Sequence, residues 1–254
     1  MLKELDFAGA VVVVTGGGGG IGEACAETLA ELGATVAIIG RTAAKLEATR
    51  AALAAKGGRC EMHVADVTSE ADVARVAAAI REKHGRVKAL INNAGDNFRT
   101  PIAALSTADW RRIVAVDLDA VFFMCRAFIP LLLEAPKPAI LNIASSFGVI
   151  GNAEMPAYCA AKGGVVNLAR QMAVDYGPKG LRVNTLCPGP TLSPRLRSYL
   201  DRGLASRAPL EEQVLLRRLA ECREIAQVAA FLVSDAASFV HGATVMADGG
   251  QTVH

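Results

Sequence analysis

The sequence predicts a single α/β domain, built as a doubly wound parallel sheet with helices on both of its faces. Short apolar runs alternate with longer amphipathic stretches along the whole chain. The strand-like runs are apolar throughout, as in the four valines at residues 11–14, which is typical of strands covered by helices on both sides. Clusters of glycine and proline stand between the runs, where connections are expected.

This alternation predicts the elements in chain order. Strands are expected at residues 10–14, 35–39, 60–64, 89–91, 139–143, 182–186 and 244–246. Helices are expected at residues 24–32, 43–55, 70–83, 108–133, 158–176 and 225–233. A chain of 254 residues can form one large core, so residues 1–254 are expected to be one domain.

One segment, residues 191–223, departs from the alternation. It is rich in arginine, and acidic residues balance the arginines. Two interpretations stay open: a mobile flap over a substrate site, or a pair of ordinary solvated helices.

Composition and charge argue against several classes of function. The formal net charge is only +2 without blocks of like charge, so neither a nucleic acid nor a membrane is expected as a partner. The N-terminus carries acidic residues where a signal peptide would be apolar. Six scattered cysteines indicate reduced thiols in the cytoplasm, and four separated histidines indicate no metal site. Chemistry on a small-molecule substrate is therefore expected.

A glycine-rich turn, residues 15–22, lies between the first predicted strand and a helix. Glycines let the backbone approach a pyrophosphate, and the amides at the start of the helix point towards the anion. A phosphate loop of the nucleotide-hydrolase type is excluded, because Glu23 and Ala24 stand where it needs Lys and then Ser or Thr. Five consecutive glycines make a match to GxGxxG weak, so a purely structural turn remains the alternative.

The second predicted strand is followed by Gly40 and Arg41. An acidic residue near this point would accept hydrogen bonds from the adenosine ribose, whereas a guanidinium would pair with a 2′-phosphate. Arg41 therefore favours NADP over NAD, with an ordinary surface arginine as the alternative.

A series of further motifs follows in order along the chain. They are Thr15-Gly16-x-x-x-Gly20-Ile21-Gly22, Asp66-Val67, Asn92-Asn93-Ala94-Gly95, Ser145, Tyr158-x-x-x-Lys162, Pro188-Gly189 and Asp248-Gly249-Gly250. Each alone is weak, but as an ordered set they resemble the short-chain dehydrogenase/reductase family over residues 16–250. The resemblance implies a Rossmann fold, a nicotinamide cofactor and a homo-oligomer, either a tetramer or a dimer.

The resemblance, together with Arg41, also implies a set of cofactor-binding residues. They are Gly16, Gly18, Gly20, Ile21, Arg41, Asp66, Val67, Asn93, Ala94, Gly95, Tyr158, Lys162, Pro188, Gly189 and Thr191.

Tyr158, Ser145 and Lys162 carry the chemistry that the resemblance implies. A free tyrosine has a pKa of ~10, too high for efficient proton transfer at neutral pH. Lys162 lies four residues after Tyr158, so on a helix both project from one face, and the ammonium together with an oxidised nicotinamide stabilises the phenolate. Ser145 is expected to hydrogen-bond the substrate oxygen. Lys162 is also expected to hold the nicotinamide ribose.

Asp117 departs from the family's pattern. The family usually has an asparagine in a V-N-L segment of the central helix, where it interrupts helical bonding and anchors a water in a proton relay. This chain has Val116, Asp117 and Leu118 there. A carboxylate keeps the acceptor oxygen but loses the amide donor, and burial would raise its pKa. Activity is still expected, with Asp117 as the fourth catalytic residue.

The predicted function is reduction of a ketone or aldehyde with NADPH, or the reverse oxidation. One alternative is a 3-oxoacyl-thioester reductase, for which Lys179 is a candidate contact to acyl carrier protein, although residues 131–136 lack the expected basic cluster. Another is an enoyl-thioester reductase, against which the intact serine, tyrosine and lysine pattern argues. A third is a non-catalytic NADP-binding sensor or structural subunit, which would be expected to lack Tyr158 or Lys162.

Overall fold

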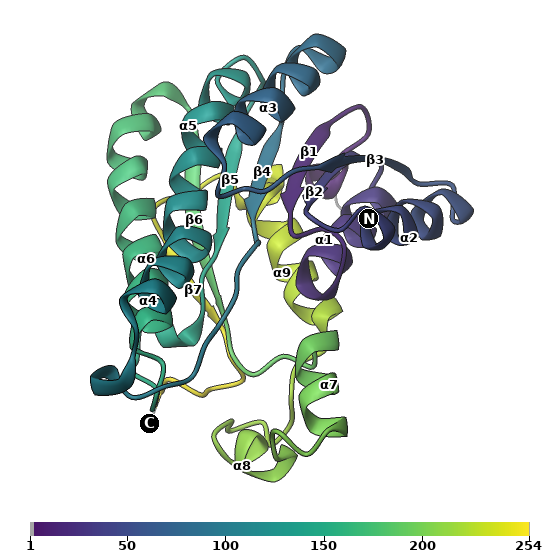
Figure 1. The fold of residues 1–254 in the computed structure, drawn as a ribbon. Coiled ribbons are helices and arrows are strands. Elements are labelled where there is room, and N and C mark those ends of the chain that lie inside the picture. The colour runs from purple at the N-terminus through teal and green to yellow at the C-terminus, as the bar shows by residue number, and fades with distance from the viewer. Residues whose placement is uncertain (1–2, 254) are drawn as a thin grey trace.

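The structure is a computed structural model that describes residues 3–253. Its centre is a sheet of seven parallel strands in the order β3-β2-β1-β4-β5-β6-β7, which confirms the predicted doubly wound architecture (Figure 1). The strands are β1 (Val11–Thr15), β2 (Thr35–Gly40), β3 (Arg59–Val64), β4 (Ala89–Asn92), β5 (Ala139–Ile143), β6 (Arg182–Pro188) and β7 (Thr244–Ala247).

Helices cover both faces of the sheet. They are α1 (Gly20–Glu31), α2 (Ala43–Ala55), α3 (Glu70–His84), α4 (Thr107–Val114), α5 (Ala120–Leu132), α6 (Pro156–Tyr176), α7 (Pro194–Asp201), α8 (Arg207–Glu212) and α9 (Cys222–Val233). In Figure 1, α3, α4, α5 and α6 lie on one side of the sheet and α1, α2 and α9 on the other. Helices α7 and α8 extend beyond one end of the sheet. Short 3-10 turns complete the described elements at Lys3–Leu5, Ile102–Ala104, Ser146–Gly148, Gly177–Lys179 and Asp235–Ala237.

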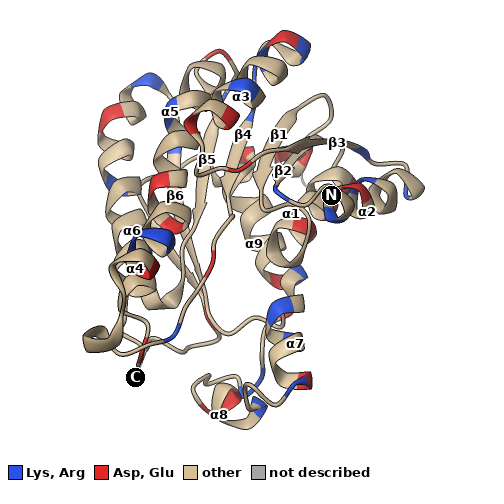
Figure 2. Ribbon diagram, in the orientation of Figure 1, with Lys and Arg blue, Asp and Glu red and all other residues tan. Residues whose placement is uncertain are grey.

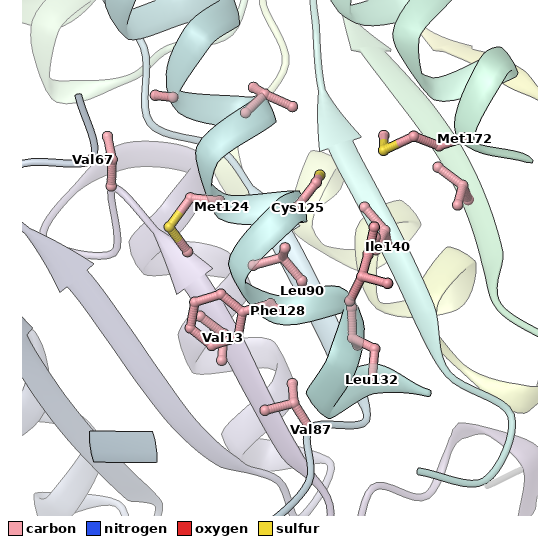
Figure 3. Packing of buried hydrophobic residues seen from close by; sticks show 14 of the residues in the cluster. Val13, Val67, Val87, Leu90, Met124, Cys125, Phe128, Leu132, Ile140 and Met172 are labelled. Atoms are coloured by element: carbon pink, nitrogen blue, oxygen red, sulfur yellow. The ribbon is translucent and has the colours of Figure 1, made fainter. Parts of the chain in front are cut away.

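Strand β1 shows why the central strands are apolar at every position. Val13 packs into the core that includes α3, α5 and α6, whereas Val12 and Val14 pack into the opposite core with α1 and α9. Figure 3 shows Val13 of β1 and Phe128 of α5 among the side chains of the first of these cores. Burial of each such side chain contributes about 1.5–3 kcal/mol to folding, so apolar residues on both faces stabilise the sheet.

The order of the strands reverses between β1 and β4. The chain proceeds from β1 to β2 and β3 in one direction, and from β4 to β7 in the other. Val12 of β1 accordingly lies between Val36 of β2 and Ala89 of β4. Loops that leave the carboxyl ends of β1 and β4 diverge at such a point, and a crevice opens between them.

The helix predicted at residues 108–133 is interrupted. Helix α4 is followed by a π-helical turn, Ala115–Asp119, before α5 begins. The N–H of Ala120 donates to the carbonyl of Ala115, one residue further back than in an α-helix. The π-turn lies inside one continuous helical stretch, and the helical pattern of the sequence did not reveal it. The turn contains Asp117.

The two ends of the segment of residues 191–223 lie side by side where the segment leaves the rest of the fold and returns to it. The N–H of Leu192 donates to the carbonyl of Ala220 at 2.8 Å, and the N–H of Ala220 donates to the carbonyl of Pro190 at 3.0 Å. Between these anchors lie α7 and α8, neither of which contains a buried residue. The segment is therefore joined to the sheet at its base and exposed along its helices.

Candidate active site

One large cavity, of about 1440 Å³, lies at the carboxyl ends of the strands, where β1 and β4 diverge. All the residues expected at the site line it. They are Gly16, Gly18, Gly20, Ile21, Arg41, Asp66, Val67, Asn93, Ala94, Gly95, Asp117, Ser145, Tyr158, Lys162, Pro188, Gly189 and Thr191. The fold thus brings together residues that are far apart in the sequence.

Gly16 and Gly22 are among the positions of the glycine-rich turn at which a side chain would clash. Gly16 has a φ of +68°, and a Cβ there would lie 2.8 Å from Nδ2 of Asn93. At Gly22, a Cβ would lie 2.3 Å from the carbonyl oxygen of Gly16. Gly22 does not line the cavity and serves to pack α1 against the turn. Gly19 precedes α1 without a side-chain cap, so the first amides of this helix are available to an anion.

Thr15 joins the loops that follow β1 and β4, a role that the sequence alone does not predict. Its hydroxyl accepts hydrogen bonds from the N–H groups of Asn93 at 2.9 Å and Ala94 at 3.0 Å. Nδ2 of Asn93 in turn donates to the Thr15 carbonyl at 3.0 Å. Thr15 is the first residue of the first family motif, and its place in that motif is the sequence feature that could have indicated this role.

Two cations line the cavity near the start of α2. Arg41 follows β2, and Lys45 lies in the first turn of α2, where its Cβ comes close to Gly18. Neither has an ion-pair partner among residues 3–253. Lys45 was missed in the sequence because it lies outside the glycine loop and reaches it only through the fold.

Asp66 follows β3 on the same side of the cavity. Its Oδ1 accepts hydrogen bonds from the N–H of Thr68 at 2.9 Å and from its hydroxyl at 2.8 Å. These bonds fix the orientation of the Asp66 carboxylate at the cavity wall.

Helix α6 and the end of β5 present the three residues expected to be catalytic. Tyr158 is half-buried and Lys162 buried, and the Lys162 Nζ lies 5.7 Å from the centroid of the Tyr158 ring. The ammonium also donates to the carbonyl of Ile143 at 3.2 Å. Ser145 is buried just beyond β5, where its Oγ accepts a hydrogen bond from the N–H of Phe147 at 3.2 Å. Its own hydroxyl hydrogen can therefore be donated to a ligand.

Asp117 is fully buried and forms an ion pair with Lys162. Its Oδ1 lies 3.0 Å from the Lys162 Nζ, and its Oδ2 accepts a hydrogen bond from the N–H of Asp96 at 3.1 Å. Oδ1 also faces Gly95, at which a Cβ would lie only 2.6 Å away. The sequence predicts the burial of this carboxylate but not its pairing with Lys162.

In the protein alone, the pKa of Tyr158 lies above the ordinary value of a tyrosine. Burial raises the pKa of Tyr158; the Lys162 ammonium lowers it, but the Asp117 carboxylate raises it again, and the net direction is upwards. Burial raises the pKa of Asp117, as expected, although Lys162 opposes the effect. For Lys162, burial alone would lower the pKa, but the Asp117 charge raises it above its usual value. The Lys162 ammonium therefore lowers the pKa of Tyr158, but burial and the Asp117 charge outweigh that effect in the protein alone.

The exposed segment contacts the crevice through an ion pair. Arg195 of α7 lies 2.8 Å from Oδ1 of Asp96, whose Oδ2 lies 2.6 Å from Arg112 of α4. Figure 2 shows basic and acidic residues distributed over α7 and α8. Asp96 lies in the loop that follows β4 and lines the cavity, so this contact connects α7 to that loop.

The turns after β6 and β7 are packed against each other. A Cβ at Gly189 would lie 2.7 Å from Cα of Asp248, so only glycine fits between them. The Asp248 carboxylate accepts hydrogen bonds from the N–H groups of Gly250 at 3.0 Å and Thr252 at 2.9 Å. The hydroxyl of Thr191 donates to the Gly189 carbonyl at 2.9 Å. Asp248 thus shapes the wall of the cavity without lining it.

Two other kinds of feature are absent from residues 3–253. No cluster of three or more His, Cys, Asp or Glu side chains suits a metal ion in that range. No helix there has the length and apolar character needed to cross a membrane.

Comparison with known proteins places the sequence among oxidoreductases. Residues 16–252 match the family model described as Enoyl-(Acyl carrier protein) reductase. The chain is 39% identical over 250 residues to the meso-2,3-butanediol dehydrogenase of Serratia marcescens, covering 98% of this chain and 96% of the relative. It is also 39% identical over 249 residues to the cis-4-hydroxycyclohexanecarboxylate dehydrogenase of Sinomonas cyclohexanicum, covering 97% and 98% of the two chains.

A solved structure from Beutenbergia cavernae has the same fold. That protein is provisionally assigned as an NAD(P)-dependent gluconate 5-dehydrogenase and contains NADP at low occupancy. The TM-score is 0.91 at 34% identity, and the match covers 99% of this chain and 100% of the other. Sequence, fold and cavity lining agree: the chain belongs to the short-chain dehydrogenase/reductase family, and it is an NAD(P)-dependent oxidoreductase of alcohols and carbonyl compounds.

Proposed function

We propose that the protein is an NADP-dependent oxidoreductase that transfers a hydride between the nicotinamide and a secondary alcohol or its ketone. Tyr158 acts as the acid and base, Ser145 holds the reacting oxygen, and Lys162 holds the nicotinamide ribose. The observation that carries the proposal is that these three side chains line one cavity together with the glycine-rich turn. When bound, the nicotinamide supplies or accepts the hydride.

In the direction of alcohol oxidation, Tyr158 takes the proton of the substrate hydroxyl as the hydride leaves the carbinol carbon. The electron pair of the O–H bond becomes the second C–O bond of the carbonyl group. Ser145 donates a hydrogen bond to the oxygen while charge develops on it. In reduction the steps are reversed, and Tyr158 returns the proton. Asp117 contributes to this catalysis through its ion pair with Lys162.

The residues at the other end of the cavity fit a dinucleotide. The close approach of Gly16 and Gly22 leaves room for a pyrophosphate at the first amides of α1. Asp66 and Val67 follow β3, where the adenine would lie. Pro188, Gly189 and Thr191 line the wall proposed for the nicotinamide.

NADP is favoured over NAD by the charges near α2. A 2′-phosphate has strong acceptor oxygens, and the guanidinium of Arg41 and the ammonium of Lys45 are both free to bind it within the described structure. The Thr42 side chain, which precedes α2 without capping it, adds a hydroxyl at the same place. An NAD-specific site would instead present a carboxylate to the ribose hydroxyls.

Residues 191–223 are proposed to be a flap over the substrate. Side chains of α7, among them Leu196 and Tyr199, and of the following turns line the same cavity as Ser145. The two relatives compared above are named for secondary alcohols, which supports a substrate of that class. The flap is part of one proposed domain formed by residues 1–254.

Thioester reduction is the second candidate. The description of the matching family model, an enoyl reductase, favours it. Ser145 can hydrogen-bond an oxygen next to the acid Tyr158, which supports carbonyl chemistry instead, because a carbonyl group takes up the proton at oxygen whereas an enoyl group takes up both hydrogens at carbon. A ketone, a 3-oxoacyl thioester and an enoyl thioester assayed side by side would separate these three reactions.

A panel of secondary alcohols and ketones tests the proposed function. Oxidation and reduction are followed by the absorbance of the reduced nicotinamide, with each cofactor form in turn. We expect turnover of at least one alcohol and ketone pair, with NADP(H) preferred. Tight binding of NADPH without turnover of any carbonyl compound would instead support a non-catalytic sensor or structural subunit.

We further propose a symmetric dimer or tetramer in the cytoplasm. Large apolar side chains stay exposed on the helices that cover one face of the sheet, including Trp110 of α4 and Phe122 of α5. Exposed apolar surface of this kind supports an interface between copies of the chain. Light scattering would give the mass in solution, and a monomer would contradict this part of the proposal.

A further inference from the structure

The buried ion pair of Asp117 and Lys162 is more than a structural contact, because it lies beside the group that exchanges the proton. Asp117 has none of its side chain exposed and Lys162 only 5%. The two are held from separate directions, since the N–H of Asp96 binds one carboxylate oxygen and the carbonyl of Ile143 accepts from the ammonium. Their relative position is therefore fixed by the fold rather than by the pair alone.

Several polar groups act on the Tyr158 phenol, and they come from four parts of the fold. These are Lys162 of α6, Asp117 of the π-helical turn, Ser145 after β5 and Arg195 of α7. Asp96 after β4 and Cys187 of β6 act on the ion pair itself. Asp96 and Arg195 form an ion pair with each other, so the cation of Lys162 and the anion of Asp117 are the main opposing charges at Tyr158.

An ammonium alone would stabilise a phenolate nearby. A carboxylate 3.0 Å from that ammonium turns the lone cation into a dipole, whose field falls off faster with distance. Burial then favours the neutral phenol, because the surroundings solvate an anion poorly. The usual asparagine of the family is neutral and would leave the lysine charge unopposed, so the aspartate of this chain changes the balance.

We propose that the Asp117 carboxylate neutralises the Lys162 ammonium in the resting enzyme and so keeps the Tyr158 phenol protonated until an oxidised nicotinamide adds its positive charge. Asp117 is thus a positioning residue that acts through Lys162. The inference rests on the proposed function, since it concerns the acid and base named there. With the reduced cofactor, Tyr158 stays the proton donor that carbonyl reduction needs.

The ionisation of Tyr158 can be measured without turnover. The chain has only three tyrosines, and the difference in tyrosinate absorbance between the parent and Tyr158→Phe isolates this phenol during a pH titration. The same difference is taken between Asp117→Asn and the double variant Asp117→Asn, Tyr158→Phe. We expect Asp117→Asn to lower the midpoint of Tyr158 by about one pH unit or more.

Asp119→Asn is the matched control. Asp119 lies in the same π-helical turn, but its side chain is exposed and does not line the cavity. The control removes the same charge from the same turn, and it should leave the midpoint of Tyr158 where it is in the parent. A midpoint that Asp117→Asn leaves unchanged or raises would overturn the inference, because Asp117 would then not oppose Lys162.

A second measurement needs no substitution at Asp117, and it decides the matter if Asp117→Asn does not fold. The ring carbon resonances of labelled tyrosine are followed through a pH titration with oxidised cofactor, with reduced cofactor and with neither. The Tyr158→Phe spectrum assigns the signal. We expect a lower midpoint with the oxidised cofactor alone, and equal midpoints in the three states would overturn the inference. Retained turnover by Tyr158→Phe would contradict the proposed function instead, and the titrations do not depend on turnover.

Discussion

The Nζ of Lys162 lies 3.0 Å from the Asp117 carboxylate, and both side chains are buried next to Tyr158. Removing one partner of a buried pair leaves an uncompensated charge, which typically costs about 3–5 kcal/mol. We therefore expect Lys162→Met to be strongly destabilised in chemical denaturation. The double variant Asp117→Asn, Lys162→Met should recover much of the loss, and a double variant no more stable than Lys162→Met would contradict a charge effect.

The stability of Lys162→Met should also depend on pH. Burial raises the pKa of Asp117, and without the ammonium nothing of opposite charge holds it down. A carboxyl group whose folded pKa is raised favours the folded state when protonated, so stability is full below the unfolded pKa and is lost as pH rises through the folded one. We expect the free energy of unfolding of Lys162→Met to fall, relative to the parent, as pH rises above the ordinary pKa range of a carboxyl group. Parallel curves for the two proteins would contradict this.

Cofactor choice should depend on the two free cations near α2. Arg41→Ala and Lys45→Ala each remove a charged contact to a 2′-phosphate, of a kind worth about 1.5–3 kcal/mol. We expect kcat/KM for NADPH to fall about 10- to 100-fold while the value for NADH stays near that of the parent. Arg50 is a matched control, because it lies on the same helix but pairs with Glu47 outside the cavity. An unchanged ratio of the two cofactors in Arg41→Ala would contradict its assignment.

The flap contact between Arg195 and Asp96 is exposed and should have a modest, salt-dependent effect. Exposed ion pairs contribute about 0.2–1 kcal/mol, so we expect Arg195→Ala to raise the KM for substrate by about fivefold or less. The difference from the parent should shrink as ionic strength rises. Arg197→Ala, on the same helix but away from the cavity lining, should leave KM unchanged. Equal effects of the two substitutions would argue against a role for the contact in closing the flap.

The glycine turn offers a test of packing. A Cβ at Gly22 would lie 2.3 Å from the Gly16 carbonyl, whereas a Cβ at Gly19 meets no atom within 4 Å. Overpacking of this kind costs about 1–3 kcal/mol, so we expect Gly22→Ala to unfold at a lower temperature than the parent. Gly19→Ala should unfold at the temperature of the parent. The reverse order of the two melting temperatures would contradict the arrangement of the turn.

Most of the fold could be predicted because it depends on local patterns. The strand at residues 139–143 and the helix at residues 43–55 have the predicted bounds, since an apolar run and an amphipathic run between turns leave little choice. Helix α1 begins at Gly20 rather than at residue 24, because glycines that are poor helix formers still take up its first turn. The π-helical turn was missed because it lies inside a continuous helical stretch between α4 and α5.

The site residues could be named from the sequence, but their interactions could not. Lys45, the ion pair of Asp117 with Lys162 and the contact of Arg195 with Asp96 all join residues that only the fold brings together. The sequence predicts that Lys162, together with an oxidised nicotinamide, stabilises the Tyr158 phenolate. In the protein alone, burial raises the pKa of Tyr158, Lys162 lowers it and Asp117 raises it, so the net direction is upwards.

Replacement of Tyr158 by phenylalanine tests the central claim most directly. The substitution removes only the phenolic oxygen, so the fold and the affinity for NADPH, measured by fluorescence, should remain close to those of the parent. Loss of an acid and base typically slows turnover about 10²- to 10⁴-fold, and we expect kcat to fall by that amount in both directions of the reaction. A Tyr158→Phe variant that binds NADPH and turns over ketone at the rate of the parent would contradict the account.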